Sequence, residues 1–103
     1  MKKQHNISFK EMSKNCEIVA QNMKVLSHPA RLMILCYLSS GEKTVGELEV
    51  LCGSSQSSVS QFLKLMRLKK LVRFEKRGLF VYYRIHDEKV KKLILSLQLI
   101  FCS

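Results

Sequence analysis

Residues 44–68 read TVGELEVLCGSSQSSVSQFLKLMRL, and this stretch predicts two short helices separated by a glycine. Thr44 is a good cap for the first helix, because its hydroxyl can accept a hydrogen bond from a free amide of the first turn. Glu47, three residues later, completes a capping box. We expect this helix to run through Leu51 and to end at Gly53.

The second helix follows without a linker. Ser54 or Ser55 caps it, and it continues to about Lys70. Its apolar residues recur at steps of three and four, which predicts one buried face. That face consists of Val59, Phe62, Leu63 and Met66.

A basic hairpin comes next. The runs Leu71 to Glu75 and Leu79 to Ile85 are rich in β-branched and aromatic residues, and Lys76-Arg77-Gly78 connects them. Gly78 can supply the positive φ that a tight turn needs. Two helices joined at a tight glycine turn and followed by a hairpin indicate a winged helix-turn-helix.

The spacing around Gly53 agrees with this motif. Leu48 precedes the glycine by five residues, and Val59 and Phe62 follow it by six and nine. These are the positions whose side chains interlock to hold the two helices at their crossing angle. Ser54 and Glu49 depart from the usual choices, because an apolar and a small residue are common at their positions.

Three further helices complete the fold class, which is mainly α with a small β-hairpin in the order α-α-α-α-β-β-α. Apolar periodicity predicts a helix from Phe9 to Leu26, Pro29 suits the first turn of a helix from Ala30 to Ser39, and Asp87 opens a last helix to about Phe101. We expect a single domain over residues 1–103, with residues 1–8 as a flexible basic N-terminus. The apolar residues of the last helix cover more than one face, so we expect the contact of a homodimer there.

The length and the charge of the chain limit the classes of function that it can have. The chain has 103 residues and a formal net charge of +10, and this length excludes a two-domain enzyme. We expect a non-enzymatic protein, because the chain lacks the CxxC motif that a thiol oxidoreductase would need. Residues 60–103 carry 11 basic and only 3 acidic side chains, which favours an extended polyanion as partner. The chain contains neither a membrane-length apolar run nor a signal-peptide core, so we expect a cytoplasmic protein without a membrane partner.

The second helix of the motif supplies the candidate contacts to double-stranded DNA. Glutamine can bind adenine in a bidentate way, serine can contact bases or phosphates, and lysine and arginine can neutralise the backbone. An ordinary polar helix face, in a dimeric interaction module that does not bind DNA, is the alternative. The candidate DNA-binding residues are Gln56, Ser57, Ser60, Gln61, Lys64 and Arg67 on the helix, with Lys76 and Arg77 at the tip of the wing.

Four segments of the chain resemble the ArsR/SmtB family of metal- and arsenic-responsive repressors. These segments are KVLSHPARLMILCYL, TVGEL, SQSSVSQFLKLMRLKKLV and RGLFVYYRI, and the resemblance covers about residues 17–102. It implies a dimeric winged-helix transcription regulator, either a repressor or a derepressor, whose first and last helices form the dimer interface.

The metal ligands of that family are not found at the matching positions. Thr44-Val45-Gly46 stands where many members have cysteines in the third helix. Another subgroup uses ligands at both ends of the last helix, and this chain keeps Asp87 but has Lys89, Ile100 and Ser103 at the other three places. We therefore expect no metal and no cofactor, with a metal-responsive repressor as an alternative.

Two of the four cysteines match another subgroup. Cys36 and Cys102 resemble the dithiol of the sulfide- and persulfide-responsive members, which include the biofilm growth-associated repressor and HlyU. The resemblance implies that reactive sulfur species or oxidants act on this pair as inducers and loosen the hold on DNA. Cys36 alone is equally typical of a buried core residue. We interpret Cys16 and Cys52 as structural, with Cys52 on the core side of its helix.

Overall fold

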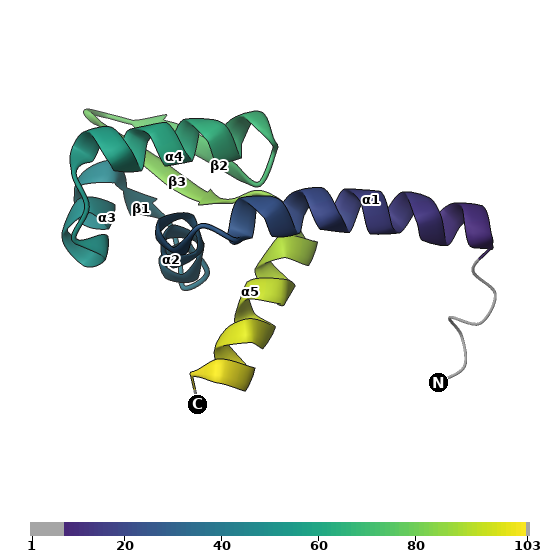
Figure 1. The fold of residues 1–103 in the computed structure, drawn as a ribbon. Coiled ribbons are helices and arrows are strands. Elements are labelled where there is room, and N and C mark those ends of the chain that lie inside the picture. Colours follow the sequence, from purple (N-terminus) through teal and green to yellow (C-terminus); the bar gives the residue numbers. More distant parts are fainter. Residues whose placement is uncertain (1–7, 103) are drawn as a thin grey trace.

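The computed structural model describes residues 8–102 and confirms the predicted fold class of five helices and a hairpin, with one additional strand. The predicted flexible N-terminus lies outside the described residues, except for Ser8, which caps the first helix. Figure 1 shows the winged motif at one end of the molecule and the first and last helices extending from it. The elements are α1 (Phe9–Leu26), α2 (Pro29–Leu38), β1 (Lys43–Thr44), α3 (Val45–Cys52), α4 (Gln56–Leu68), β2 (Val72–Arg77), β3 (Phe80–Ile85) and α5 (Glu88–Phe101).

The sheet is antiparallel in the order β1-β3-β2. In the wing, Val72 pairs with Ile85 at one end and Arg77 with Phe80 at the other. The turn is therefore Gly78-Leu79, and the prediction that Lys76 and Arg77 form the turn was wrong. A two-residue turn with glycine first, here at φ 63°, matches the twist of the strands, so both cations become the last residues of β2.

Strand β1 was not predicted. It has two residues, which is too short to produce an alternating pattern, and it forms because Thr44 and Lys43 pair with Tyr82 and Tyr83. The predicted end of α4 at Lys70 was also too late. Lys70 adopts φ 62°, and this left-handed conformation ends the helix at Leu68.

The core lies where α2 meets the motif, the wing and α5. Each fully buried Leu or Ile there contributes about 1.5–3 kcal/mol relative to an exposed position. The side chains that are less than 2% exposed are Ile34, Leu35, Leu48, Val59, Leu63, Met66, Leu71, Val72 and Ile94. The central position predicted for the second helix is confirmed.

Helix α1 is different, because it projects away from the body (Figure 1). Of its 18 residues, only Val25 and Leu26 are buried. The radius of gyration is 15.4 Å, whereas a compact domain of this length has about 13 Å. Within residues 8–102, no helix combines the length and apolar content that a membrane span requires.

Candidate nucleic-acid interface

Local hydrogen bonds set the positions of the two motif helices. The hydroxyl Oγ1 of Thr44 accepts a hydrogen bond from the Glu47 amide at 3.1 Å, and Glu47 Oε1 accepts one from the Thr44 amide at 2.8 Å, so the predicted capping box is confirmed. Gly53 follows at φ 66°, a conformation that disfavours side chains with a Cβ, and its amide donates to the Glu49 carbonyl. Ser55 then caps α4 by accepting from the Ser58 amide at 3.1 Å.

The buried side of α4 determines which residues face outward. Val59, Leu63 and Met66 are fully buried against the core, and Leu48 of α3 is equally buried. Phe62 is half-buried and contacts the ring of His28, with 4.9 Å between the ring centroids. The predicted burial of Leu48 and Val59 between the motif helices is confirmed, whereas Phe62 packs against His28 and Arg31 at the start of α2.

The outward side of α4 carries the predicted contact residues. All six are exposed, and their spacing of three and four residues places most of them along one stripe of the helix. They are Gln56, Ser57, Ser60, Gln61, Lys64 and Arg67. Acidic side chains do not occur on α4, so this stripe combines hydrogen-bonding groups with positive charge.

Arg67 differs from the others because its guanidinium contacts the wing. It lies 5.2 Å from the centroid of the Phe74 ring on β2. This cation–π contact connects the C-terminal end of α4 to the wing.

The two wing cations lie in different surroundings. Lys76 is exposed, and no hydrogen bond or ion pair to it is present in the described chain. Arg77 donates to the carboxylate of Glu42, lies 4.0 Å from Glu75 Oε1, and stacks 4.0 Å over the Tyr82 ring centroid. The hydrogen bond to Glu42, together with the charges of both carboxylates, raises the pKa of Arg77. Sequence reasoning missed Glu42, because this partner is 35 residues away in the chain.

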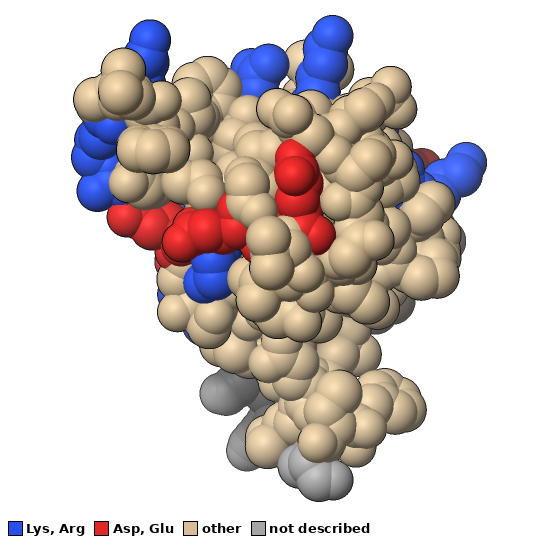
Figure 2. All heavy atoms as spheres, turned by 90° about the vertical axis from the view of Figure 1, so that its left-hand side faces the viewer, with Lys and Arg blue, Asp and Glu red and all other residues tan. Residues whose placement is uncertain are grey.

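Charge is separated on the face of the molecule that carries the motif. Figure 2 shows most of the visible Lys and Arg side chains along the upper edge and sides of this face, Asp and Glu grouped below them with further blue atoms beside the group, and uncharged residues toward the lower end. The upper edge corresponds to the side on which α4 and the wing lie in Figure 1. A polyanion is therefore attracted to the α4 side and repelled from the α3 side.

His28 is a second residue that sequence reasoning missed. Its Nδ1 accepts a hydrogen bond from the Ala30 amide at 3.1 Å and so caps α2. Arg31 donates from Nε to the Val25 carbonyl at 3.0 Å, which fixes α2 against the end of α1. The ring contact with Phe62 extends this connection to α4. The only available signal was a polar residue directly before Pro29.

The two predicted redox-sensing cysteines lie on neighbouring helices. Cys36 is half-buried in α2, and Cys102 is exposed at the C-terminal cap of α5. Gln98 connects them: its Nε2 donates to the Cys36 carbonyl and to Ser39 Oγ, each at 3.3 Å. The Cys102 amide donates to the Gln98 carbonyl at 2.8 Å, so Cys102 lies one turn further along the same side of α5.

The other two cysteines have separate environments. Cys52 is half-buried and packs against the core, as predicted, and burial raises the pKa of its thiol. Cys16 is exposed on α1 in a shallow apolar hollow formed by Met12, Val19 and Ala20. It therefore fills no space in the core of the protomer and lies on the exposed apolar face of α1.

Metal-ligating side chains are scattered in the described part of the chain. Between residues 8 and 102, no group of three or more His, Cys, Asp or Glu side chains is arranged to hold a metal ion. Asp87 instead accepts a hydrogen bond from the Lys89 amide at 2.9 Å and caps α5.

Comparison with known proteins identifies the family. The family model described as "Bacterial regulatory protein, arsR family" matches residues 28–73. The biofilm growth-associated repressor of Xylella fastidiosa (strain Temecula1 / ATCC 700964) is 38% identical over 98 residues, which cover 95% of this chain and 86% of that protein.

Solved structures agree with the assignment. Reduced HlyU from Vibrio cholerae N16961 superposes with a TM-score of 0.87 at 35% identity, covering 92% of this chain and all of that one. A homodimeric winged helix-turn-helix DNA-binding domain from Mycobacterium bovis, described as a possible ArsR-family regulator, gives a TM-score of 0.75 at 28% identity, covering 93% and 88%. The relatives are transcription regulators, which confirms the prediction of a non-enzymatic protein. The capped two-helix motif, its wing and these similarities together show that the chain belongs to the arsR family of bacterial transcription regulators.

Proposed function

We propose that the protein is a homodimeric regulator that binds specific sequences of double-stranded DNA and is released by chemistry at Cys36 and Cys102. The observation that carries the DNA-binding part is the outward stripe of α4. This stripe is exposed, basic and rich in amide and hydroxyl groups, on a helix held from behind by three fully buried residues. A helix of this kind fits the major groove.

Different residues of the stripe contact the bases and the phosphate backbone. Gln56 and Gln61 can each form a bidentate pair with adenine, and the hydroxyls of Ser57 and Ser60 are short enough for bases or phosphates. Lys64 contacts the backbone beside them. Lys76 of the wing, with Arg67 behind it, contacts the phosphates or the minor groove next to the half-site, and Arg77 is available to join them only when Glu42 releases it.

Exposed apolar side chains favour a second copy as the partner of α1 and α5. Met12, Val19 and Met23 are 51%, 50% and 40% exposed on α1, and Ile100 and Phe101 are 68% and 78% exposed on α5. A chain of this size rarely leaves so much apolar surface in water. The related domain from Mycobacterium bovis is homodimeric, which supports a second copy of the chain as the partner. A dimer also presents two α4 helices to half-sites about one DNA turn apart.

Gln98 supports control by the cysteine pair. It contacts the Cys36 carbonyl, and Cys102 lies one turn beyond it on α5. A disulfide holds its two Cα atoms about 4.4–6.8 Å apart, so a Cys36–Cys102 crosslink would fix the last turn of α5 at that distance from α2. Such a crosslink changes the position of α5, and with it the distance between the two recognition helices of the dimer.

The reaction with a persulfide is balanced. The Cys36 thiolate attacks the outer sulfur of glutathione persulfide, which forms a Cys36 persulfide and releases glutathione thiolate. The Cys102 thiolate then attacks the Cys36 sulfur, forms the disulfide and releases hydrosulfide. The two protein thiols are oxidised, and the sulfane sulfur is reduced to sulfide.

The DNA-binding part is tested by selecting duplexes from a random library with the reduced protein. We expect enrichment of an inverted repeat. The Gln61→Ala variant should then lose preference at one position of each half-site, whereas Lys64→Ala should bind all sequences more weakly. A library without an enriched sequence would leave a dimeric interaction module as the function.

The thiol part is tested by mass spectrometry and DNA binding on the same samples after treatment with glutathione persulfide. We expect a Cys36–Cys102 crosslink within one protomer and weaker DNA binding. Cys36→Ser and Cys102→Ser should bind as the reduced parent does and fail to respond. Cys16→Ser is the matched control and should respond normally. A response that survives in Cys36→Ser but is lost in Cys16→Ser would refute the assignment.

A further inference from the structure

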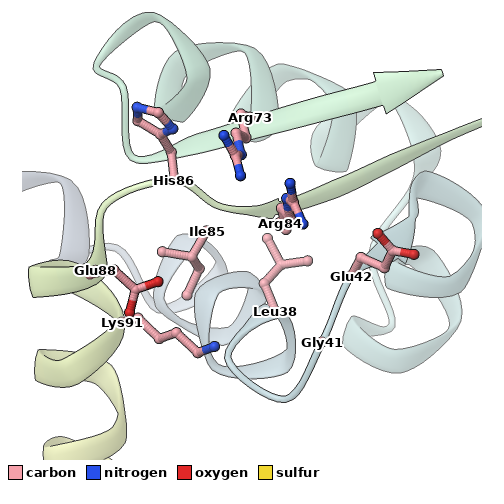
Figure 3. A pocket seen from close by; sticks show the side chains of 9 residues that line it. All are labelled: Leu38, Gly41, Glu42, Arg73, Arg84, Ile85, His86, Glu88 and Lys91. Carbon is pink, nitrogen blue, oxygen red and sulfur yellow. The ribbon is translucent and has the colours of Figure 1, made fainter.

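A concave pocket lies where the base of the wing meets α5 and the segment between α2 and β1. Figure 3 shows the side chains that line it. Three elements contribute cationic side chains to the pocket: β2 contributes Arg73, β3 contributes Arg84 and α5 contributes Lys91. His86 lies at the same end of β3, and Leu38 and Ile85 contribute apolar surface. This pocket is separate from α4, the wing turn and the cysteine pair.

The two arginines form an unusual pair. Arg73 and Arg84 are directly opposite each other in the register of β2 and β3, so their side chains leave the sheet on the same face. Figure 3 shows their guanidinium groups next to one another. Like charges at directly opposite positions destabilise a strand pair, so this arrangement calls for a compensating negative charge.

Protein carboxylates do not supply that charge within residues 8–102. The ion pairs found there involve only Arg77, so Arg73, Arg84 and Lys91 have no carboxylate within 4.0 Å. Glu42 lines the pocket, but its carboxylate is bound to Arg77. Glu88 is the second acidic lining residue, and it lies at the first position of α5, outside salt-bridge distance of the three cations.

We propose that this pocket binds a doubly charged tetrahedral oxyanion of the size of sulfate or phosphate. Two guanidinium groups offer planar, bidentate donors to such an anion, and Lys91 adds a point charge from the opposite side. Lys91 is half-buried and lines the pocket. A bound dianion cancels the repulsion between Arg73 and Arg84 and connects the wing to α5.

The test uses the reduced protein without DNA, so its result is independent of the DNA and thiol proposals. Amide and arginine side-chain NMR signals are followed while sodium sulfate or sodium phosphate replaces sodium chloride at constant ionic strength. We expect saturable shifts centred on Arg73, Arg84 and Lys91. Arg73→Gln and Arg84→Gln should each weaken binding about tenfold, as expected for the loss of a bidentate charged contact. Lys92→Gln is the matched control, because Lys92 is the exposed neighbour of Lys91 and does not line the pocket.

Thermal unfolding provides a second test, because the order of the Tm values of the parent and Arg84→Gln should differ between chloride and sulfate. In chloride, Arg84→Gln should match or exceed the parent in Tm, because the substitution removes the repulsion. In sulfate the order should reverse, since only the parent and Lys92→Gln gain from binding. An equal gain for all three proteins would mean that sulfate acts only by exclusion from the protein surface, and would overturn the proposal.

A phosphate group of the DNA backbone could occupy the same pocket in place of a free anion. Duplex affinity is therefore measured in chloride for Arg73→Gln and Lys92→Gln. We expect equal affinities, because the pocket lies at the base of the wing rather than at its tip. A loss confined to Arg73→Gln would assign the pocket to the DNA backbone and refute a site for free anions.

Discussion

The salt dependence of DNA binding should report which cations contact phosphates. Each protomer presents Lys64, Arg67, Lys76 and Arg77 on α4 and the wing, but Arg77 is already paired with Glu42. Three free cations per protomer correspond to six in a dimer. With about 0.9 counterions released per contact, log affinity should fall against log salt with a slope of about −5. Between 50 and 200 mM salt, affinity should then decrease on the order of 10³-fold.

Two substitutions test this reasoning in opposite directions. Lys64→Gln removes two contacts from the dimer and should flatten the slope by about 2, whereas Glu42→Gln releases Arg77 and should steepen it by about 2. Fluorescence anisotropy of a labelled duplex over a series of KCl concentrations measures both, with Lys92→Gln as the control for net charge. An unchanged slope in Lys64→Gln would refute the placement of DNA on α4. An unchanged slope in Glu42→Gln would show that Arg77 only fixes the wing.

Three further outcomes are expected. Val19→Glu should make the protein monomeric in sedimentation and abolish specific DNA binding, because an unpaired charge in an apolar interface costs several kcal/mol. The control variant Gln21→Glu, on the opposite side of α1, should stay dimeric. Leu48→Ala removes a side chain that is 0% exposed between the motif helices; it should lower the free energy of unfolding by about 2–5 kcal/mol in urea titrations. Cys52 should react with iodoacetamide more slowly in the folded protein than after unfolding in urea at neutral pH, and its reaction should accelerate as pH rises, since burial raises the pKa of its thiol and the thiolate is the nucleophile.

Local sequence signals predicted those parts of the fold that local chemistry determines. The Thr44 capping box, the positive φ of Gly53 and the buried spacing of Val59 and Met66 each depend on residues within a few positions of one another. The exposure of the α4 stripe follows from the same periodicity. These features were therefore predictable from the sequence alone.

Contacts between distant segments were not predictable in the same way. The pairing of Arg77 with Glu42, the packing of His28 on Phe62 and the hydrogen bond from Gln98 to Cys36 join residues far apart in the chain. Their geometry depends on how α2, the wing and α5 meet, and no periodicity encodes it. Sequence reasoning could therefore name Arg77 as a wing cation but could not detect the carboxylate that holds it.

These long-range contacts suggest how a change at the thiols would reach the DNA-binding surface. Cys36 lies in the last turn of α2, and Ser39, which follows this helix, shares the Gln98 contact. Only a short segment separates the end of α2 from Glu42, whose carboxylate holds Arg77 at the end of β2. A crosslink that pulls the end of α2 toward α5 therefore acts on the same segment that fixes the wing. Because packed helices move as rigid units rather than deforming smoothly, a displacement of the end of α2 would act on Glu42 through the turn at residues 39–41 instead of being absorbed within α2.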